Sequence, residues 1–393
     1  MWFIQTAVAR YTLYQCHNYL FDKIIEEQTT KNKPTQAKSN KIDATQNFWV
    51  SIVIPTYKRA ALLPHLLTAL KQQTYQNFDV VFVVKPSDDN TEAILKQAAH
   101  TLNLTVIIQT EGYIVDAYFL GVKHTTGDIV ALLDDDALPA KDWLQETVKI
   151  FQTTKVDGIT GDCFPVLLKK DTLEIIKEPE VPAQFSHLEF AFFGCPIAGL
   201  EQYKNAIANS GFVYERGNNP YWRKRKAVKA LLRGPSMAVW GDALREINLP
   251  GEWLLGCAWE MVLGWQLWQR GLVLIYSPKV KVYHIVHGRT SSRDFLRPRA
   301  DLLWAVEAEL LFYRLYGAET HLSLISKITS DLFRVAHSLK YIRSNPNYQL
   351  RKIEGIAIGN ILGIKWLLYK ALDVNYSPLL DLKKIKKSQP KTY

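Results

Sequence analysis

Four short apolar runs between residues 50 and 133, separated by segments with helical periodicity, constrain the fold more than any other feature of the sequence. The runs are rich in β-branched residues, which is typical of buried strands. We expect a strand from Val50 that closes at Pro55, and further strands at 78–84, 104–108 and 129–133. Strands that alternate with helices predict a parallel sheet with right-handed crossovers. Because the strands are continuously apolar, we expect helices on both faces of the sheet.

The fourth run ends in three consecutive carboxylates, Asp134, Asp135 and Asp136, with Pro139 close behind. Adjacent negative charges repel one another, so the cluster needs a compensating cation or full solvation. Carboxylate oxygens suit Mg²⁺ or Mn²⁺, and the carboxyl ends of strands in open α/β sheets face the crevice where ligands bind. In isolation, a solvated acidic turn would be the simpler interpretation. The apolar strand before the cluster favours a metal and nucleotide site.

Three segments in this order resemble the family 2 glycosyltransferases. They are the opening Ser51-Ile-Val-Ile-Pro-Thr-Tyr-Lys-Arg59, the cluster Leu132-Leu-Asp-Asp-Asp-Ala-Leu-Pro139, and the later pair Trp259-Glu260. The resemblance covers roughly residues 48–315 and implies the GT-A fold, a mixed, mostly parallel sheet flanked by helices. It also implies metal-dependent transfer of a sugar from a nucleotide-diphosphate-sugar to an acceptor hydroxyl, with inversion at the anomeric carbon. The implied cofactor is Mn²⁺ or Mg²⁺.

The same resemblance assigns roles to individual residues. Glu260 is implied as the catalytic base, although an acid in the first turn of a helix also favours the helix dipole. Asp134, Asp136 and His284 are implied as metal ligands, but a histidine at a strand end is as often an ordinary hydrogen-bonding residue. The implied donor-binding residues are Pro55, Thr56, Tyr57, Arg59, Lys85, Asp134, Asp135, Gly234 and Trp259. Trp265 and Trp268 have helical spacing, which favours core packing over a sugar platform.

Lys85 departs from the family pattern. Members often carry an acid after the second strand that reads the nucleotide base, and here this position is a lysine. Asp88 or Asp89 could substitute only after a shift in register. Because of this departure, the sequence does not decide whether the donor is a GDP-, dTDP- or UDP-sugar.

Composition divides the chain into three regions. We expect an N-terminal helix and linker at 1–47, a glycosyltransferase domain at 48–315 and a basic helical region at 316–393. Within the domain, 48–140 would bind the nucleotide and 141–315 the acceptor. The four cysteines (Cys16, Cys163, Cys195 and Cys257) lie far apart, which argues against a zinc site or a disulfide framework. Together with an N-terminus unlike a signal peptide, this predicts a cytoplasmic protein.

The region from Lys340 onward has eleven Lys and Arg against three acidic residues. The segment 355–372 is apolar but is interrupted by Lys365 and Lys370, so we reject a membrane-spanning helix. A basic helix lying on an anionic leaflet is the better interpretation, with a helical cap on the domain as the alternative. We therefore expect peripheral contact with the cytoplasmic face of the membrane and a carbohydrate or lipid-linked acceptor. No motif accompanies the basic tracts, so nucleic acid is not an expected partner.

Two other functional classes compete with glycosyl transfer in polysaccharide, glycolipid or glycoconjugate assembly. A catalytically inactive domain acting as a membrane-associated scaffold would not need both Glu260 and the Asp134–Asp136 cluster. A nucleotidyltransferase should carry a glycine-rich loop directly after the first strand. The segment from Pro55 to Arg59 has no glycine, which makes this class the least favoured.

Overall fold

The computed structural model describes residues 46–169, 172–176, 187–200, 202–215, 220–225, 227–249, 253–285, 297–316 and 321–388. The predicted N-terminal helix and nearly all of its linker lie outside these residues. All four predicted strands are present, namely β1 (Val50–Thr56), β2 (Phe78–Val84), β3 (Leu104–Ile108) and β4 (Ile129–Leu133). The helices between them are α2 (Leu63–Lys71), α3 (Thr91–Ala98) and α4 (Ile114–Val122).

The sheet is mixed and mostly parallel, as predicted. β1 pairs in parallel with β2 and β4, and β2 pairs in parallel with β3. The second half of the sheet comprises β6 (Gly158–Lys169), β10 (Val228–Lys229), β11 (Ser236–Trp240) and β12 (Leu274–Ile285). The strand order is β10-β12-β6-β11-β4-β1-β2-β3, with β11 antiparallel to both of its neighbours. The short strands β5 (Ala137–Pro139) and β7 (Thr172–Ile175) pair with β12 and β6.

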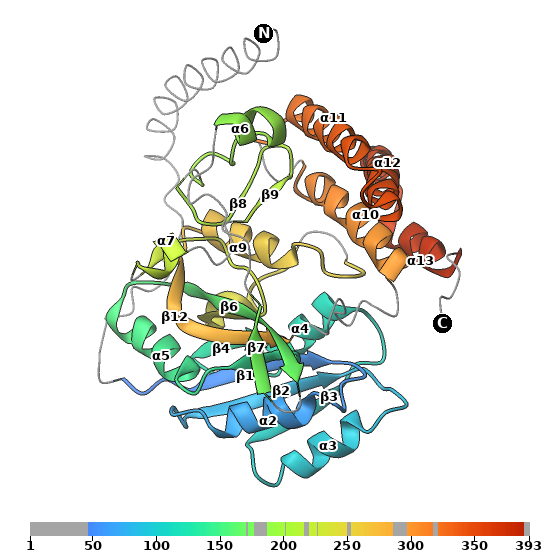
Figure 1. Cartoon of the computed structure of the whole chain (residues 1–393). Coiled ribbons are helices and arrows are strands. Elements are labelled where there is room, and N and C mark those ends of the chain that lie inside the picture. The colour runs from blue at the N-terminus through green and yellow to red at the C-terminus, as the bar shows by residue number, and fades with distance from the viewer. Residues whose placement is uncertain are drawn as a thin grey trace.

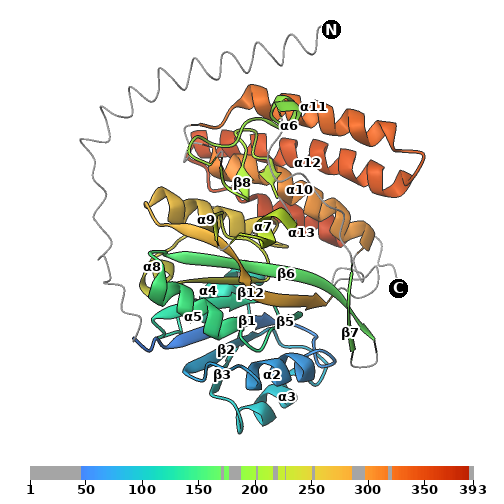
Figure 2. The ribbon, with the colours of Figure 1, turned by 60° about the vertical axis from the view of Figure 1, so that its left-hand side comes forward.

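Helices cover both faces of the sheet, and each face has its own hydrophobic core. Ile52 and Ile54 of β1 point toward α2 and α5 (Trp143–Thr153) in the first core. Val53, which points the opposite way because side chains alternate along a strand, belongs to a second core. This second core also contains residues of α4, α8 (Gly241–Arg245) and α9 (Trp259–Gln269). Figure 2 shows α2 and α3 on one side of the sheet and α9 on the other.

The C-terminal helices form a further layer above α9 (Figure 1). They are α10 (Arg297–Leu315), α11 (Leu324–Lys340), α12 (Pro346–Ala371) and α13 (Pro378–Ser388). Three glycines of α12 allow close contact with α10: a Cβ on Gly355 would lie 2.4 Å from that of Ala305, and one on Gly363 would lie 2.0 Å from the ring of Tyr313. The expected boundary at 315 thus separates α10 from the helix against which it packs. Within the described residues, no helix is long and apolar enough to cross a membrane.

The segment between β7 and β10 contributes small elements, the first of which lies beside α11 (Figure 1). They are α6 (His187–Phe193), the hairpin of β8 (Ala206–Ile207) and β9 (Val213–Tyr214), and α7 (Pro220–Arg223). Gly211 turns the hairpin at a φ of 78°, and a Cβ there would lie 2.7 Å from that of Phe312 on α10. The hairpin is therefore packed directly against the C-terminal layer.

Candidate functional site

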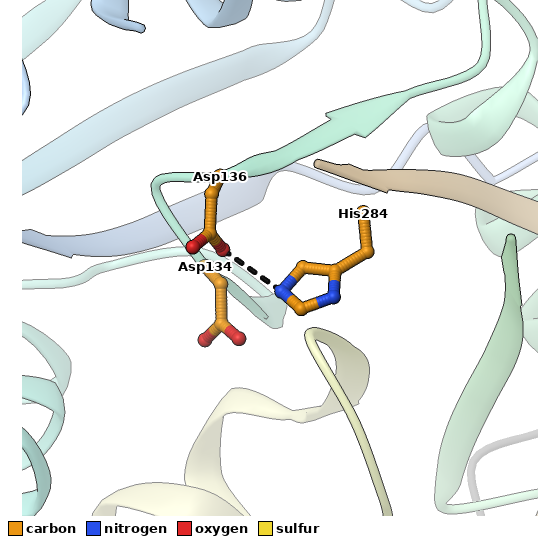
Figure 3. Close-up of side chains that lie close together, drawn as sticks. All are labelled: Asp134, Asp136 and His284. Carbon is orange, nitrogen blue, oxygen red and sulfur yellow. Dashed lines mark ion pairs between the residues drawn. The ribbon is translucent and has the colours of Figure 1, made fainter. Parts of the chain in front are cut away.

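The carboxylate cluster lies at the carboxyl end of β4, as the strand pattern predicts. β5 follows directly and pairs with β12 in antiparallel register, with Ala137 opposite His284. This pairing brings the imidazole to the cluster, where its Nε2 lies 3.0 Å from Oδ1 of Asp136 (Figure 3). Ligand atoms of Asp134, Asp136 and His284 lie within 4.8 Å of one another. Two carboxylates and an imidazole form a donor set that fits Mn²⁺ or Mg²⁺.

Arg59 supplies a positive charge to the cluster from the loop after β1. Its Nε donates to Asp135 Oδ1 and its Nη2 to Asp136 Oδ2, both at 3.0 Å. Burial raises the pKa of Asp135 to about 7, although the charge of Arg59 acts in the opposite direction. The guanidinium thus neutralises part of the charge that the sequence left uncompensated. The predicted role of Arg59 in donor binding is not tested by this contact, but its side chain is already engaged by two aspartates.

Tyr118 bonds to the carboxylate cluster, and Trp259 packs against Tyr118. The Tyr118 hydroxyl, which is fully buried, donates a hydrogen bond to Asp134. The indole of Trp259 stacks on the Tyr118 ring at a centroid distance of 4.8 Å and is only 3% exposed. The structure thus places Trp259 in the core, where it cannot form the aromatic rim of a sugar site. Trp265 is also buried, in agreement with the predicted core packing.

Glu260 shares a cavity of about 590 Å³ with the cluster. Asp134, His284 and Glu260 all line this cavity, together with Gly234. Ala258 has a left-handed φ of 58° and turns the chain into α9, so that Glu260 occupies the first helical turn. Burial raises the pKa of the Glu260 carboxyl to about 8, with a further contribution from the negative charge of Asp134. The cavity-facing position and the raised pKa are those of a proton-transfer group, and they disfavour a simple helix cap.

The comparisons with known proteins agree with this geometry. Residues 51–196 match the sequence profile described as glycosyl transferase family 2. This match places a glycosyl transferase family 2 domain in the first half of the chain. The glycosyltransferase AglE of Haloferax volcanii is 32% identical over 118 residues, which are 29% of this chain and 39% of that protein. The chondroitin synthase of Escherichia coli is 34% identical over 222 residues, 51% of this chain and 31% of that protein. The chain therefore spans about a third of the length of these curated relatives.

A solved structure supports the GT-A fold of the chain. It is the mannosyltransferase PcManGT from Pyrobaculum calidifontis in complex with GDP-Man and Mn²⁺. The two chains are 17% identical and superpose with a TM-score of 0.50, over 91% of this chain and 97% of the other. At this level of identity the likeness concerns the fold alone.

The remaining donor-binding candidates lie at the ends of β1 and β2 and just before β11. Pro55 and Thr56 are buried at the end of β1, whereas Tyr57 is exposed. The Lys85 ammonium donates to the Gly112 carbonyl at 3.0 Å, so it is held beside the end of β2. Gly234 has a φ of 82° and open space where a Cβ would be. Donor contact by these residues stays a prediction.

The Asp89 carboxylate has a structural role, because it joins two loops by hydrogen bonds. It accepts hydrogen bonds from the backbone N–H groups of Ala60 and Thr91 and from the Ser87 hydroxyl. These bonds outweigh partial burial and lower its pKa to about 2. Asp88 is exposed and pairs with Lys58 at 2.7 Å. The carboxylate of Asp89 is therefore committed to joining the loops after β1 and β2, which leaves it poorly suited to replace a base-reading acid.

Glu307 of α10 is a site residue that the sequence did not reveal. Its buried carboxylate accepts hydrogen bonds from the backbone N–H groups of Leu254, Leu255 and Cys257, at 2.6, 3.0 and 3.0 Å. These residues lead directly into Glu260, so the C-terminal layer fixes the approach to α9. The available signal was a pair of glutamates, Glu307 and Glu309, within the otherwise apolar stretch from Leu302 to Leu311, because a buried charge requires partners.

Proposed function

We propose that the chain transfers a sugar from a nucleotide-diphosphate-sugar to an acceptor hydroxyl, with inversion at the anomeric carbon. The observation that carries the proposal is one cavity lined by Asp134 and His284 of the metal-ligand set and by Glu260, a half-buried acid with a raised pKa. The family assignment supports the same reaction class. The proposed acceptor is a carbohydrate or a lipid-linked molecule in polysaccharide, glycolipid or glycoconjugate assembly.

Each residue has one task in this mechanism. Ionised Glu260 accepts the proton of the acceptor hydroxyl while its oxygen attacks the anomeric carbon. The bond from that carbon to the diphosphate breaks in the same displacement, which releases the nucleoside diphosphate and inverts the configuration. Asp134, Asp136 and His284 would hold Mn²⁺ or Mg²⁺, which as a Lewis acid stabilises charge on the departing diphosphate. Arg59 holds Asp135 and Asp136 in place throughout.

The test is release of nucleotide from UDP-, GDP-, dTDP- and CMP-sugars in the presence of Mn²⁺, with and without a chelator. Hydrolysis of one donor that the chelator abolishes, and that is lost in Asp136→Ala, would support the proposal and identify the nucleotide. Donor binding in a thermal-shift assay without any turnover, even with mixed saccharide acceptors, would contradict it. That second outcome would favour the inactive scaffold.

We also propose that the chain binds peripherally to the cytoplasmic face of a membrane through α11 and α12. Each helix presents a stripe of apolar side chains that are more than half exposed, namely Leu324, Ile325, Ile328 and Leu332 on α11, and Leu350, Ile361, Ile364 and Leu368 on α12. Exposed lysines such as Lys340 and Lys370 accompany them. Apolar stripes with flanking basic residues are suited to an anionic lipid surface.

Co-sedimentation with vesicles tests this location. The full chain should bind vesicles containing phosphatidylserine more strongly than phosphatidylcholine vesicles, and Ile361→Glu with Leu368→Glu should abolish binding. Ile175→Glu is the matched control, because Ile175 is similarly exposed on β7, outside both helices. Binding that survives the double substitution would exclude this face as the contact.

A further inference from the structure

A buried ammonium group faces the cavity without a carboxylate partner. Lys204 is only 3% exposed, lines the cavity and lies 4.4 Å above the ring of Tyr276. The two nearby carboxylates are taken by arginines: Arg223 Nε lies 2.8 Å from Asp162, and Arg233 Nη2 lies 2.6 Å from Glu215. Among the residues that the structure describes, no carboxylate forms an ion pair with Lys204.

Burial without a partner is unfavourable for a charged amine. It lowers the pKa of Lys204 to about 8, and the neighbouring charge of Arg233 lowers it further while Asp162 and Glu215 oppose the shift. The adjacent Asn205 also lines the cavity, and its buried Oδ1 has no hydrogen-bond partner in the described part of the chain. Two neighbouring polar groups, one of them charged, are thus left for a ligand.

The position of Lys204 assigns this wall to the acceptor side of the cavity. Its backbone N–H donates to the carbonyl of Lys229 on β10 at 2.9 Å, and its ring partner Tyr276 is on β12. β10 and β12 end the sheet opposite β1–β3, where the predicted donor residues lie. The same cavity continues to Glu260. An acceptor could therefore reach the base while another part of it contacts Lys204.

We propose that Lys204, with Asn205 beside it, forms a subsite for an anionic group of the acceptor, either a phosphate or a carboxylate. This inference rests on the proposed function, because it names the chemical class of the acceptor in that reaction. An anion here would give the ammonium the charged partner that the described residues do not provide. The Oδ1 of Asn205 is an acceptor, so it would take a hydrogen bond from a hydroxyl of the same acceptor molecule rather than contact the anion.

Calorimetric titration of the full chain at pH 7, without donor or metal, tests the subsite. The probes are glucose 1-phosphate, glucuronate and neutral glucose. At least one anionic probe should bind about 10-fold or more tightly than glucose, and Lys204→Met should remove that difference. Lys204→Arg keeps the charge and should retain most of the binding. Lys229→Met is the matched control, because it removes an exposed lysine from the adjacent strand.

Each outcome decides the matter. Preference for glucose 1-phosphate supports a phosphate-bearing acceptor, and preference for glucuronate supports an acidic sugar. Equal binding of glucose and both anions by the unmodified chain would overturn the inference, as would absence of binding by every probe. Anion binding that survives in a folded Lys204→Met variant would overturn it as well. Because no donor is present, these results are independent of the donor-hydrolysis test of the proposed function.

Discussion

Removal of the Glu307 carboxylate tests whether the C-terminal layer holds the segment that leads to the proposed base. In Glu307→Ala, three backbone N–H groups lose their acceptor, and Arg314, whose Nη2 lies 3.5 Å away, loses its charged neighbour. Hydrogen bonds to a charged group are each worth about 1.5–3 kcal/mol. Removing one partner of a buried ion pair costs about 3–5 kcal/mol. Because water can replace part of the lost bonding, we expect a loss of about 4 kcal/mol in the free energy of unfolding.

Urea denaturation of the variant and the unmodified chain measures this loss, provided that the unfolding free energy of both falls with urea concentration at the same slope. Glu307→Gln keeps the size of the side chain and one oxygen acceptor, so it should cost less than alanine. Glu354→Gln is the matched control, because Glu354 pairs with Arg351 on the partly exposed surface of α12. A surface pair of this kind is worth about 0–1 kcal/mol.

Amide hydrogen exchange gives a second, local measurement. The amides of Leu254, Leu255 and Cys257 should exchange faster in Glu307→Gln, while strand β4 keeps its protection. If Glu307→Ala lies within about 1 kcal/mol of the unmodified chain, and these amides remain protected, the carboxylate does not hold the segment and the reasoning is refuted.

Three further outcomes follow from the site and its packing. Glu260→Gln should abolish transfer. The pKa of the Glu260 carboxyl is near 8 in the folded chain and near 4.5 ordinarily, so ionisation of this group lowers the stability of the unmodified chain as pH rises from about 5 to 8. The variant has no such group, so its stability should rise relative to that of the unmodified chain across this window. A parallel pH dependence of the two melting temperatures would contradict that. Asp136→Asn should remove the Mn²⁺-dependent rise in melting temperature, and a retained rise would exclude Asp136 as a ligand. Gly363→Leu should destabilise the chain by about 1–3 kcal/mol through overlap with Tyr313 on α10, whereas Ile361→Leu, at an exposed position on α12, should change the urea midpoint little.

The order of strands and helices was readable from the sequence because its signals are local. Apolar runs with β-branched residues predicted β2, β3 and β4 at the observed positions. The position of the carboxylate cluster at the ligand-binding edge followed from the same pattern, because parallel strands bring their carboxyl ends to one edge of the sheet. β3 differs from the expectation in one respect: it is the last strand in the order, and Val106 and Ile108 are exposed. Local apolarity cannot distinguish an edge strand from a central one, since the difference lies in which partner is absent.

The contacts that turn these segments into a site depend on residues far apart in the chain. Arg59 neutralises two aspartates 76 and 77 residues away, and no local pattern encodes that pairing. Trp259 was expected among the donor-binding residues because it directly precedes the proposed base, yet packing against Tyr118 places it in the core. The sequence by itself therefore determined the resemblance to family 2 glycosyltransferases, the alternation of strands and helices between residues 50 and 133, and the acidic residues. The tertiary structure decided which charges neutralise one another, how α10 anchors the segment before Glu260, and that Lys204 faces the cavity, because burial and charge pairing are set by neighbours that only the folded chain brings together.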